Sequence, residues 1–284
     1  MFKSLIRSKF ISQLHFNNRR FFSCSHELEF IQMSSPAERV GLITLNRPKA
    51  KNALCNKLID ELNHALYHYE EDEGIACIVV TGHQDYFAAG ADIKEMSNLT
   101  FSDCYKQSFL QDRDYLSKVK KPTIGVVNGF ALGGGCEIAL MCDILVAGNN
   151  ALLGQPEITI GTIPGMGGSQ RLARIIGKSR TMEMVLTGEP MKAEEALQRG
   201  IVSKVASKEK SLEEGIELAK KIASKSILIS MACKDVVNTA YETTLSQGIA
   251  YEKRVFWSTF ATEDRKLGMN NFVNKVKDYK FTDS

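Results

Sequence analysis

Residues 128–137 read Asn-Gly-Phe-Ala-Leu-Gly-Gly-Gly-Cys-Glu, and they follow directly on the apolar stretch 123–127. The residues after the glycines are apolar and predict a buried helix, so three glycines stand just before a helix N-terminus. Such a loop leaves backbone N–H groups without partners, and these can hold a phosphate or a developing oxyanion. The dinucleotide fingerprint does not fit, because Ile138 occupies its third glycine position, and the Walker A pattern is absent. The loop therefore favours an oxyanion site.

A second loop of small residues follows the predicted strand 76–81. Residues 87–94 read Phe-Ala-Ala-Gly-Ala-Asp-Ile-Lys. Small residues let a ligand approach the backbone closely, and Asp92 is well placed to cap a short helix after the loop. On its own, this pattern is more typical of an ordinary turn.

A third segment is rich in glycine and proline. It contains Gly-Gln-Pro-Glu at 154–157 and a defined loop over 161–171. Ser169 is not the nucleophile of a Gly-x-Ser-x-Gly elbow, because Arg171 replaces the last glycine of that motif. Ser169 is instead predicted to be a helix cap.

Two carboxylates stand out beside these loops. Glu137 ends the triple-glycine segment and Glu157 lies in the third segment, both among apolar residues where an acid is costly unless it is used or paired. Glu137 could be an acid favoured by a helix dipole, and Glu157 a loop residue paired with a cation. As a pair near amide donors, they suit proton transfer at a carbon next to a carbonyl.

Short apolar strands alternate with helices or long connections, which favours parallel β/α units. The segment between the first two strands has a helical period, and Asn52 is its predicted N-cap. After Gly168 the pattern is mostly helical, and from about Leu212 onward it predicts helices alone. The predicted strands are 40–45, 76–81, 123–127, 143–147 and 201–205.

The composition is that of a globular protein. The chain has 284 residues, of which 44% are hydrophobic and 24% charged, with a net charge of +3. This small charge gives no argument for nucleic acid binding. No stretch after residue 27 reaches about 18 uninterrupted apolar residues, so no membrane span is expected. The seven cysteines have no CxxC spacing and are predicted to be free thiols.

No metal or redox cofactor is expected from the sequence. His64 and His68 lie four residues apart on one predicted helix, but Ala65 stands where the HExxH motif has its glutamate. No third ligand is suggested. We therefore interpret both histidines as structural.

The N-terminus differs from the rest of the chain. It is basic and contains serines, and no Asp or Glu precedes Glu27. This pattern is typical of a mitochondrial transit peptide over residues 1–27, the alternative being a disordered basic tail. The pattern predicts a mitochondrial matrix protein.

Together, these motifs resemble the crotonase superfamily, over essentially everything after residue 27. Within this superfamily, the chain is most similar to the mitochondrial short-chain enoyl-CoA hydratases, and it has both glutamates, one of which many relatives replace. The matching segments are 41–48, 88–92, 131–137, 154–157, 164–172, 184–188 and 259–262.

The resemblance implies an α/β fold, a crotonase-type spiral of β-β-α turns over 28–220. A C-terminal helical region, 221–284, would serve subunit contacts in a homo-oligomer, a trimer or a dimer of trimers.

The resemblance also implies the chemistry. It predicts an enoyl-CoA hydratase of fatty acid β-oxidation, which adds water to a trans-2-enoyl-CoA to give a 3-hydroxyacyl-CoA. CoA is part of the substrate and no separate cofactor is needed. An enoyl-CoA isomerase, or a binding protein on a crotonase scaffold, is the alternative.

The family's site residues carry over onto matching positions. The amides of Ala91 and Gly134 would form the oxyanion hole, and Glu137 and Glu157 would be catalytic. The substrate-binding residues would be Ala91, Asp92, Ile93, Lys94 and Gly134.

Overall fold

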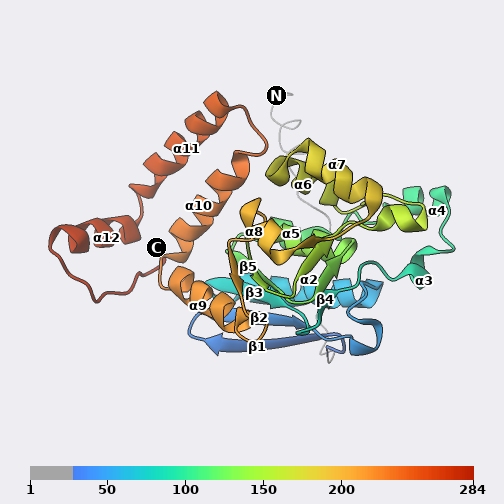
Figure 1. Ribbon diagram of the computed structural model, residues 1–284. Coiled ribbons are helices and arrows are strands. Elements are labelled where there is room, and N and C mark those ends of the chain that lie inside the picture. The colour runs from blue at the N-terminus through green and yellow to red at the C-terminus, as the bar shows by residue number, and fades with distance from the viewer. Residues whose placement is uncertain (1–27) are drawn as a thin grey trace, which may run out of the picture.

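The computed structural model describes residues 28–284 and contains two β-sheets surrounded by helices (Figure 1). The predicted transit peptide, residues 1–27, lies outside the described residues. The cysteines within 28–284 are free thiols. Every helix in this range is too short or too polar to span a lipid bilayer.

The larger sheet has six strands in the order β1-β2-β3-β5-β7-β10. β1 pairs antiparallel with β2, and all other neighbours are parallel. Every residue of β3 and β5 is buried, as expected for parallel strands covered on both faces. The six strands are β1 (Ile31–Ala37), β2 (Val40–Leu45), β3 (Cys77–Thr81), β5 (Thr123–Val127), β7 (Ile144–Gly148) and β10 (Lys204–Ala206).

The smaller sheet has four short strands in the order β4-β6-β8-β9. β4, β6 and β8 are adjacent and parallel, so their carboxyl ends meet at one edge. The pairs β3 and β4, β5 and β6, and β7 and β8 each add one strand to each sheet before a helix follows, which confirms the predicted spiral of β-β-α turns. The four strands are β4 (Tyr86–Ala88), β6 (Phe130–Leu132), β8 (Leu152–Gly154) and β9 (Met191–Lys192).

Helices connect and cover the sheets. α2 buries the apolar face that its period predicts, including Leu58, Leu62 and Leu66, and packs on β1 and β2. The first helices are η1 (Pro48–Ala50), α2 (Asn56–Glu71), α3 (Ile93–Met96), α4 (Phe101–Gln107), η2 (Tyr115–Lys118), α5 (Gly134–Met141) and η3 (Glu157–Ile160). The remaining helices are α6 (Gly168–Ile176), α7 (Lys178–Thr187), α8 (Ala193–Gln198), α9 (Ser211–Ala223), α10 (Ile227–Thr239), α11 (Leu245–Thr259) and α12 (Glu263–Val273).

Three local predictions were wrong. Asn52 does not cap α2, whose N-cap is Cys55, because the Asn52 side chain turns inward and is 1% exposed. Ser169 does not cap α6, which begins at Gly168 after a left-handed Gly167. The last strand begins at Lys204, so the apolar residues of 201–205 only partly coincide with it.

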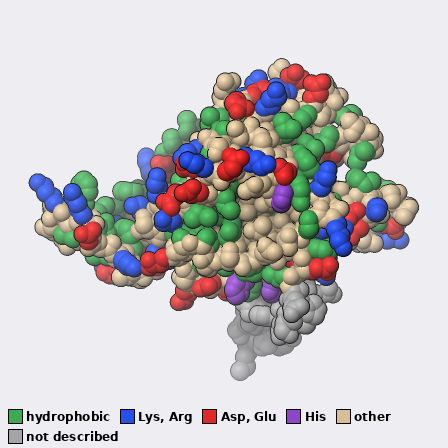
Figure 2. Space-filling view, turned by 60° about the horizontal axis from the view of Figure 1, so that its bottom comes forward, with side chains coloured by type: hydrophobic (Ala, Val, Ile, Leu, Met, Phe, Trp, Pro, Cys, Tyr) green, Lys and Arg blue, Asp and Glu red, His purple; other side chains and the backbone are tan. Residues whose placement is uncertain are grey.

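The C-terminal helices confirm the predicted helical region. α9 covers the larger sheet, where it contacts β3 and β5, while α10, α11 and α12 extend away from it (Figure 1). No residue of α10 or α11 is buried. On the face drawn in Figure 2, Lys and Arg side chains are interspersed with Asp and Glu.

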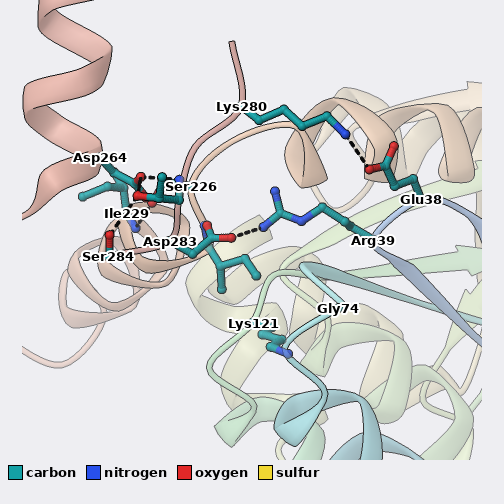
Figure 3. A network of polar contacts seen from close by, with 12 residues as sticks. Glu38, Arg39, Gly74, Lys121, Ser226, Ile229, Asp264, Lys280, Asp283 and Ser284 are labelled. Carbon is teal, nitrogen blue, oxygen red and sulfur yellow. Dashed lines mark hydrogen bonds and ion pairs between the residues drawn. The ribbon is translucent and has the colours of Figure 1, made fainter.

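The last residues of the chain return to the turn between β1 and β2 (Figure 3). Arg39 Nη2 lies 2.5 Å from Asp283 Oδ2, and Lys280 Nζ lies 2.8 Å from Glu38 Oε1. Asp283 Oδ1 also accepts a hydrogen bond of 2.6 Å from the Ile227 N–H, at the start of α10. Asp283 therefore joins the tail, the first hairpin and the C-terminal helices.

We expect Asp283→Ala to lower the free energy of unfolding by roughly 1–2 kcal/mol, because a helix N-terminus and Arg39 both lose a charged acceptor. Lys280→Ala is the matched control, since its ion pair with Glu38 is 85% and 75% exposed and contributes little. Urea unfolding of both variants measures the difference. Equal stability of the two variants would contradict this role of Asp283.

Candidate active site

Glu137 is a buried carboxylate in the first turn of α5. It is 2% exposed, and its Oε1 accepts hydrogen bonds from the Met166 N–H at 2.7 Å and the Gly168 N–H at 2.8 Å. Burial raises the pKa of Glu137, while these two amides and the charge of Arg171 oppose that rise. The amides thus hold one oxygen and favour the ionised form.

Glu157 is the first residue of η3 and is only partly buried. Burial raises its pKa to about 7, its own backbone N–H opposes the rise, and the negative charge of Glu137 adds to it. The two carboxylates are therefore close enough to interact but sit in different environments. With a pKa of about 7, Glu157 exchanges between its protonated and ionised forms near neutral pH.

The Gln155 side chain is fully buried behind Glu157. With its nitrogen facing the carboxylate, the Gln155 amide donates to Glu157 Oε1 at 3.0 Å and to Oε2 at 3.2 Å. A β-carbon on Gly168 would approach this amide group to 2.5 Å, so only glycine fits there without displacing Gln155. Gly168 therefore serves both acids, since its N–H binds Glu137.

The triple glycine lies against both acids. A β-carbon on Gly133 would lie 2.9 Å from Glu157 Oε1, and one on Gly134 would lie 3.2 Å from the Met166 methyl group. The Gly133 N–H is already bonded to Gly154 O at 2.8 Å. A side chain would collide at both positions, so glycine lets the loop lie against Glu157 and keeps the space beside it free of side chains.

Two backbone amides meet beside this space. Within residues 28–284, neither the Ala91 N–H nor the Gly134 N–H has an acceptor. A β-carbon on Gly134 would lie 3.6 Å from the Ala91 nitrogen, and one on Gly90, whose φ is +107°, would lie 4.0 Å from the Gly134 nitrogen. Two unsatisfied donors this close can share one oxyanion.

The remaining residues of the second loop are placed differently. Asp92 caps α3 as predicted, accepting from the Lys94 N–H at 3.2 Å, and its other oxygen lies 2.7 Å from Arg47 Nη1. The Arg47 guanidinium holds the pKa of Asp92 below its usual range. Ile93 and Lys94 are exposed beside the loop. The Asp92 carboxylate is thus already occupied within the protein.

The sequence assigned no role to Gln155 or to the amides of Met166 and Gly168. Gln155 belongs to the quoted Gly-Gln-Pro-Glu segment, and an amide side chain two residues before the glutamate was the available signal. The Met166 and Gly168 amides had no such signal, because every residue other than proline carries an N–H.

A large cavity lies between the body and the C-terminal helices. Its volume is 1990 Å³, and its lining includes Gly165 and Met166, whose N–H binds the Glu137 carboxylate. The body contributes Leu110 and Arg171, and α11 contributes Phe256.

Within 28–284, no three His, Cys, Asp or Glu side chains group as a metal site.

Comparisons with known proteins agree with this geometry. A family profile described as enoyl-CoA hydratase/isomerase matches residues 36–283. The mitochondrial enoyl-CoA hydratase of Pongo abelii is 58% identical over 84% of this chain and 82% of its own length. The probable mitochondrial enoyl-CoA hydratase of Dictyostelium discoideum is 54% identical over 84% of this chain and 86% of its own.

Solved structures share the fold as well. A crystal structure from Geobacillus kaustophilus, described as enoyl-CoA hydrates subunit I, has a TM-score of 0.88 and 39% identity. The likeness covers 91% of this chain and all of that one.

The raised pKa of Glu157 should make the free energy of unfolding depend on pH. A carboxyl whose pKa is about 7 when folded but near 4.5 when unfolded destabilises the protein progressively as the pH rises between these values. We therefore expect Glu157→Gln to be more stable than wild type at pH 8, and the gain to vanish near pH 4. Thermal unfolding across this range measures it. A gain that is constant with pH would contradict the raised pKa.

Proposed function

Because the chain belongs to the enoyl-CoA hydratase/isomerase family, we propose that its site adds water across the double bond of a trans-2-enoyl-CoA. The chain is an enoyl-CoA hydratase, and the product is a 3-hydroxyacyl-CoA. The observation that carries the proposal is the pair of unlike carboxylates, Glu137 and Glu157, beside the two free amides of Ala91 and Gly134.

The amides act on the thioester oxygen. When water adds at C3, negative charge moves through C2 onto that oxygen, and the Ala91 and Gly134 N–H groups stabilise it as an enolate. One such donor contributes roughly 3–4 kcal/mol in comparable acyl sites. Both donors belong to the backbone, so they cost no reorganisation when the charge develops.

The carboxylates move the protons. Ionised Glu137, held by the Met166 and Gly168 amides, positions the water and takes its proton as the C3–O bond forms. Protonated Glu157 delivers its proton to C2, and the proton that Glu137 took from water then moves to Glu157, which restores both groups. One oxygen and two hydrogens are added in total, so no redox step occurs and the reaction requires neither a metal nor a further cofactor.

Isomerisation is the second candidate in this family. Moving the double bond needs one group that takes a proton and returns it, and Glu157 alone could serve. Glu137 would then have no catalytic role, although the Met166 and Gly168 amides hold its carboxylate inside the site. The cost of burying this second acid favours hydration. A binding protein on the same scaffold would need neither acid.

The surface of α11 and α12 supports self-association. Apolar side chains on these helices are exposed, which is unusual for a protein that works as a monomer. We therefore propose a homo-oligomer, a trimer or a dimer of trimers, with these helices in its contacts. The exposed apolar residues are Leu245, Ile249, Phe256, Trp257, Phe260, Met269, Phe272 and Val273.

The proposed place of action is the mitochondrial matrix, in fatty acid β-oxidation. The basic composition of residues 1–27 supports a transit peptide, and two similar relatives are described as mitochondrial. A trans-2-enoyl-CoA is the product of acyl-CoA oxidation, so hydration follows that step.

Glu137→Gln and Glu157→Gln are each expected to lower kcat for crotonyl-CoA by roughly 10²–10⁴-fold, because each removes one proton-transfer group. Thioester binding should survive, since both amides remain. Loss of the absorbance of the conjugated thioester measures turnover, and calorimetric titration measures binding. Near-normal turnover in both variants would contradict the assignment.

Replacing Trp257 with Glu should dissociate the oligomer, because a charge would enter an apolar contact. Phe101→Glu is the control, since Phe101 is also exposed but lies on α4, away from the C-terminal helices. Sedimentation velocity measures the mass of both. An unchanged mass for Trp257→Glu, or a wild-type monomer, would contradict the proposed contact.

A further inference from the structure

The segment between β2 and α2 runs alongside the loop that carries Ala91. The Leu54 N–H donates to Gly90 O at 2.8 Å, and the Asp92 N–H donates to Leu54 O at 3.1 Å. Leu54 is thus bonded to the residues on either side of Ala91. In a parallel ladder, the residue between two such bonds turns its own N–H to the opposite side. This pairing directs the Ala91 N–H away from Leu54, into the space shared with Gly134.

Asn52 fixes the start of this pairing. It adopts a left-handed conformation with φ of +57°, and its side chain is buried. Its Oδ1 accepts from the Arg47 N–H at 2.8 Å, and its Nδ2 donates to Leu45 O at 3.2 Å and to Phe87 O at 2.9 Å. One amide thus joins the end of β2 to β4, just before the loop begins.

Arg47 and Asp92 fix the other side of Ala91. Arg47 Nη1 donates to Asp92 Oδ2 at 2.7 Å and to Ala53 O at 2.8 Å. The Arg47 backbone is in turn held by Asn52. Ala91 therefore lies between two tethers that meet at Arg47, and neither tether needs a ligand to form.

We propose that Asn52, together with the Arg47–Asp92 pair, positions the Ala91 N–H as an oxyanion donor. This proposal rests on the proposed function, since it assigns the donor a thioester oxygen. Asn52 and Asp92 touch no reacting atom and act through the backbone. The Asp92 carboxylate is bound by Arg47 and the α3 N-terminus, so we assign it a positioning role in addition to the predicted substrate-binding role of this residue.

Asn52→Gly is the direct test, because glycine keeps the left-handed backbone but removes the side chain. We expect kcat for crotonyl-CoA to fall roughly 10–100-fold, less than the full loss of an oxyanion donor. KM should change little. Asp92→Asn keeps an oxygen for the Lys94 N–H but removes the charge facing Arg47, so a smaller fall is expected. It serves as the second variant if Asn52→Gly does not fold.

A spectroscopic reading separates positioning from loss of stability. A dimethylaminocinnamoyl thioester of CoA absorbs at longer wavelength when donors polarise its carbonyl, without turnover. Its absorbance maximum should shift strongly to the red when it binds to the wild type. The shift should be smaller when it binds to Asn52→Gly or Asp92→Asn. Asp283→Ala is the control, because it is expected to weaken the fold away from the loop. Its shift should match that of wild type.

A full red shift and unchanged kcat in a folded Asn52→Gly or Asp92→Asn variant would overturn the proposal. A reduced shift in Asp283→Ala would also overturn it, because general loosening would then explain the effect. Absence of crotonyl-CoA hydration in the wild type would refute the proposed function alone, since the absorbance shift requires no turnover.

Discussion

The site depends on two backbone N–H groups, those of Ala91 and Gly134, that the fold leaves without an internal acceptor. An unsatisfied buried N–H is costly, so the surrounding structure must hold both in place. The three parallel strands β4, β6 and β8 do this by ending side by side. The Ala91 loop, the triple glycine and the Gly-Gln-Pro-Glu segment follow the carboxyl ends of these strands and therefore lie at the same edge of the smaller sheet. Strands of only three residues thereby bring together groups that lie 66 residues apart in the sequence, from Ala91 to Glu157.

The two acids differ because their hydrogen-bond partners differ. Burial raises the pKa of both acids, but two backbone N–H donors oppose the rise at Glu137, whereas the charge of Glu137 adds to the rise at Glu157. One fold thus supplies a base and an acid of the same residue type near neutral pH. The Gln155 amide and Gly168 complete the arrangement, because Gly168 lets Gln155 approach Glu157 while its own N–H holds Glu137.

Much of this could be predicted from the sequence, where short-range chemistry decides the outcome. The apolar period of α2, the buried strands β3 and β5, and the cap at Asp92 follow from local patterns. Asn52 and Ser169 were misplaced because a helix-capping residue type says nothing of where its side chain turns, and Asn52 turns into the core. The smaller sheet was not predicted, since its strands are too short to show a period. The contacts among Glu137, Glu157 and Gln155 are tertiary, so the sequence could pair the two acids only through their apolar surroundings and the resemblance to a family.

The pH dependence of kcat/KM for hydration of crotonyl-CoA tests this account most directly, because it reports the ionisation of the free enzyme. With Glu157 as the acid, kcat/KM should decline as the pH rises through about 7, where its carboxyl loses the proton. Glu157→Gln should lose this alkaline decline along with most of its activity. A wild-type kcat/KM that instead rises through this range to an alkaline plateau would show that the reaction needs ionised Glu157, and would contradict the account.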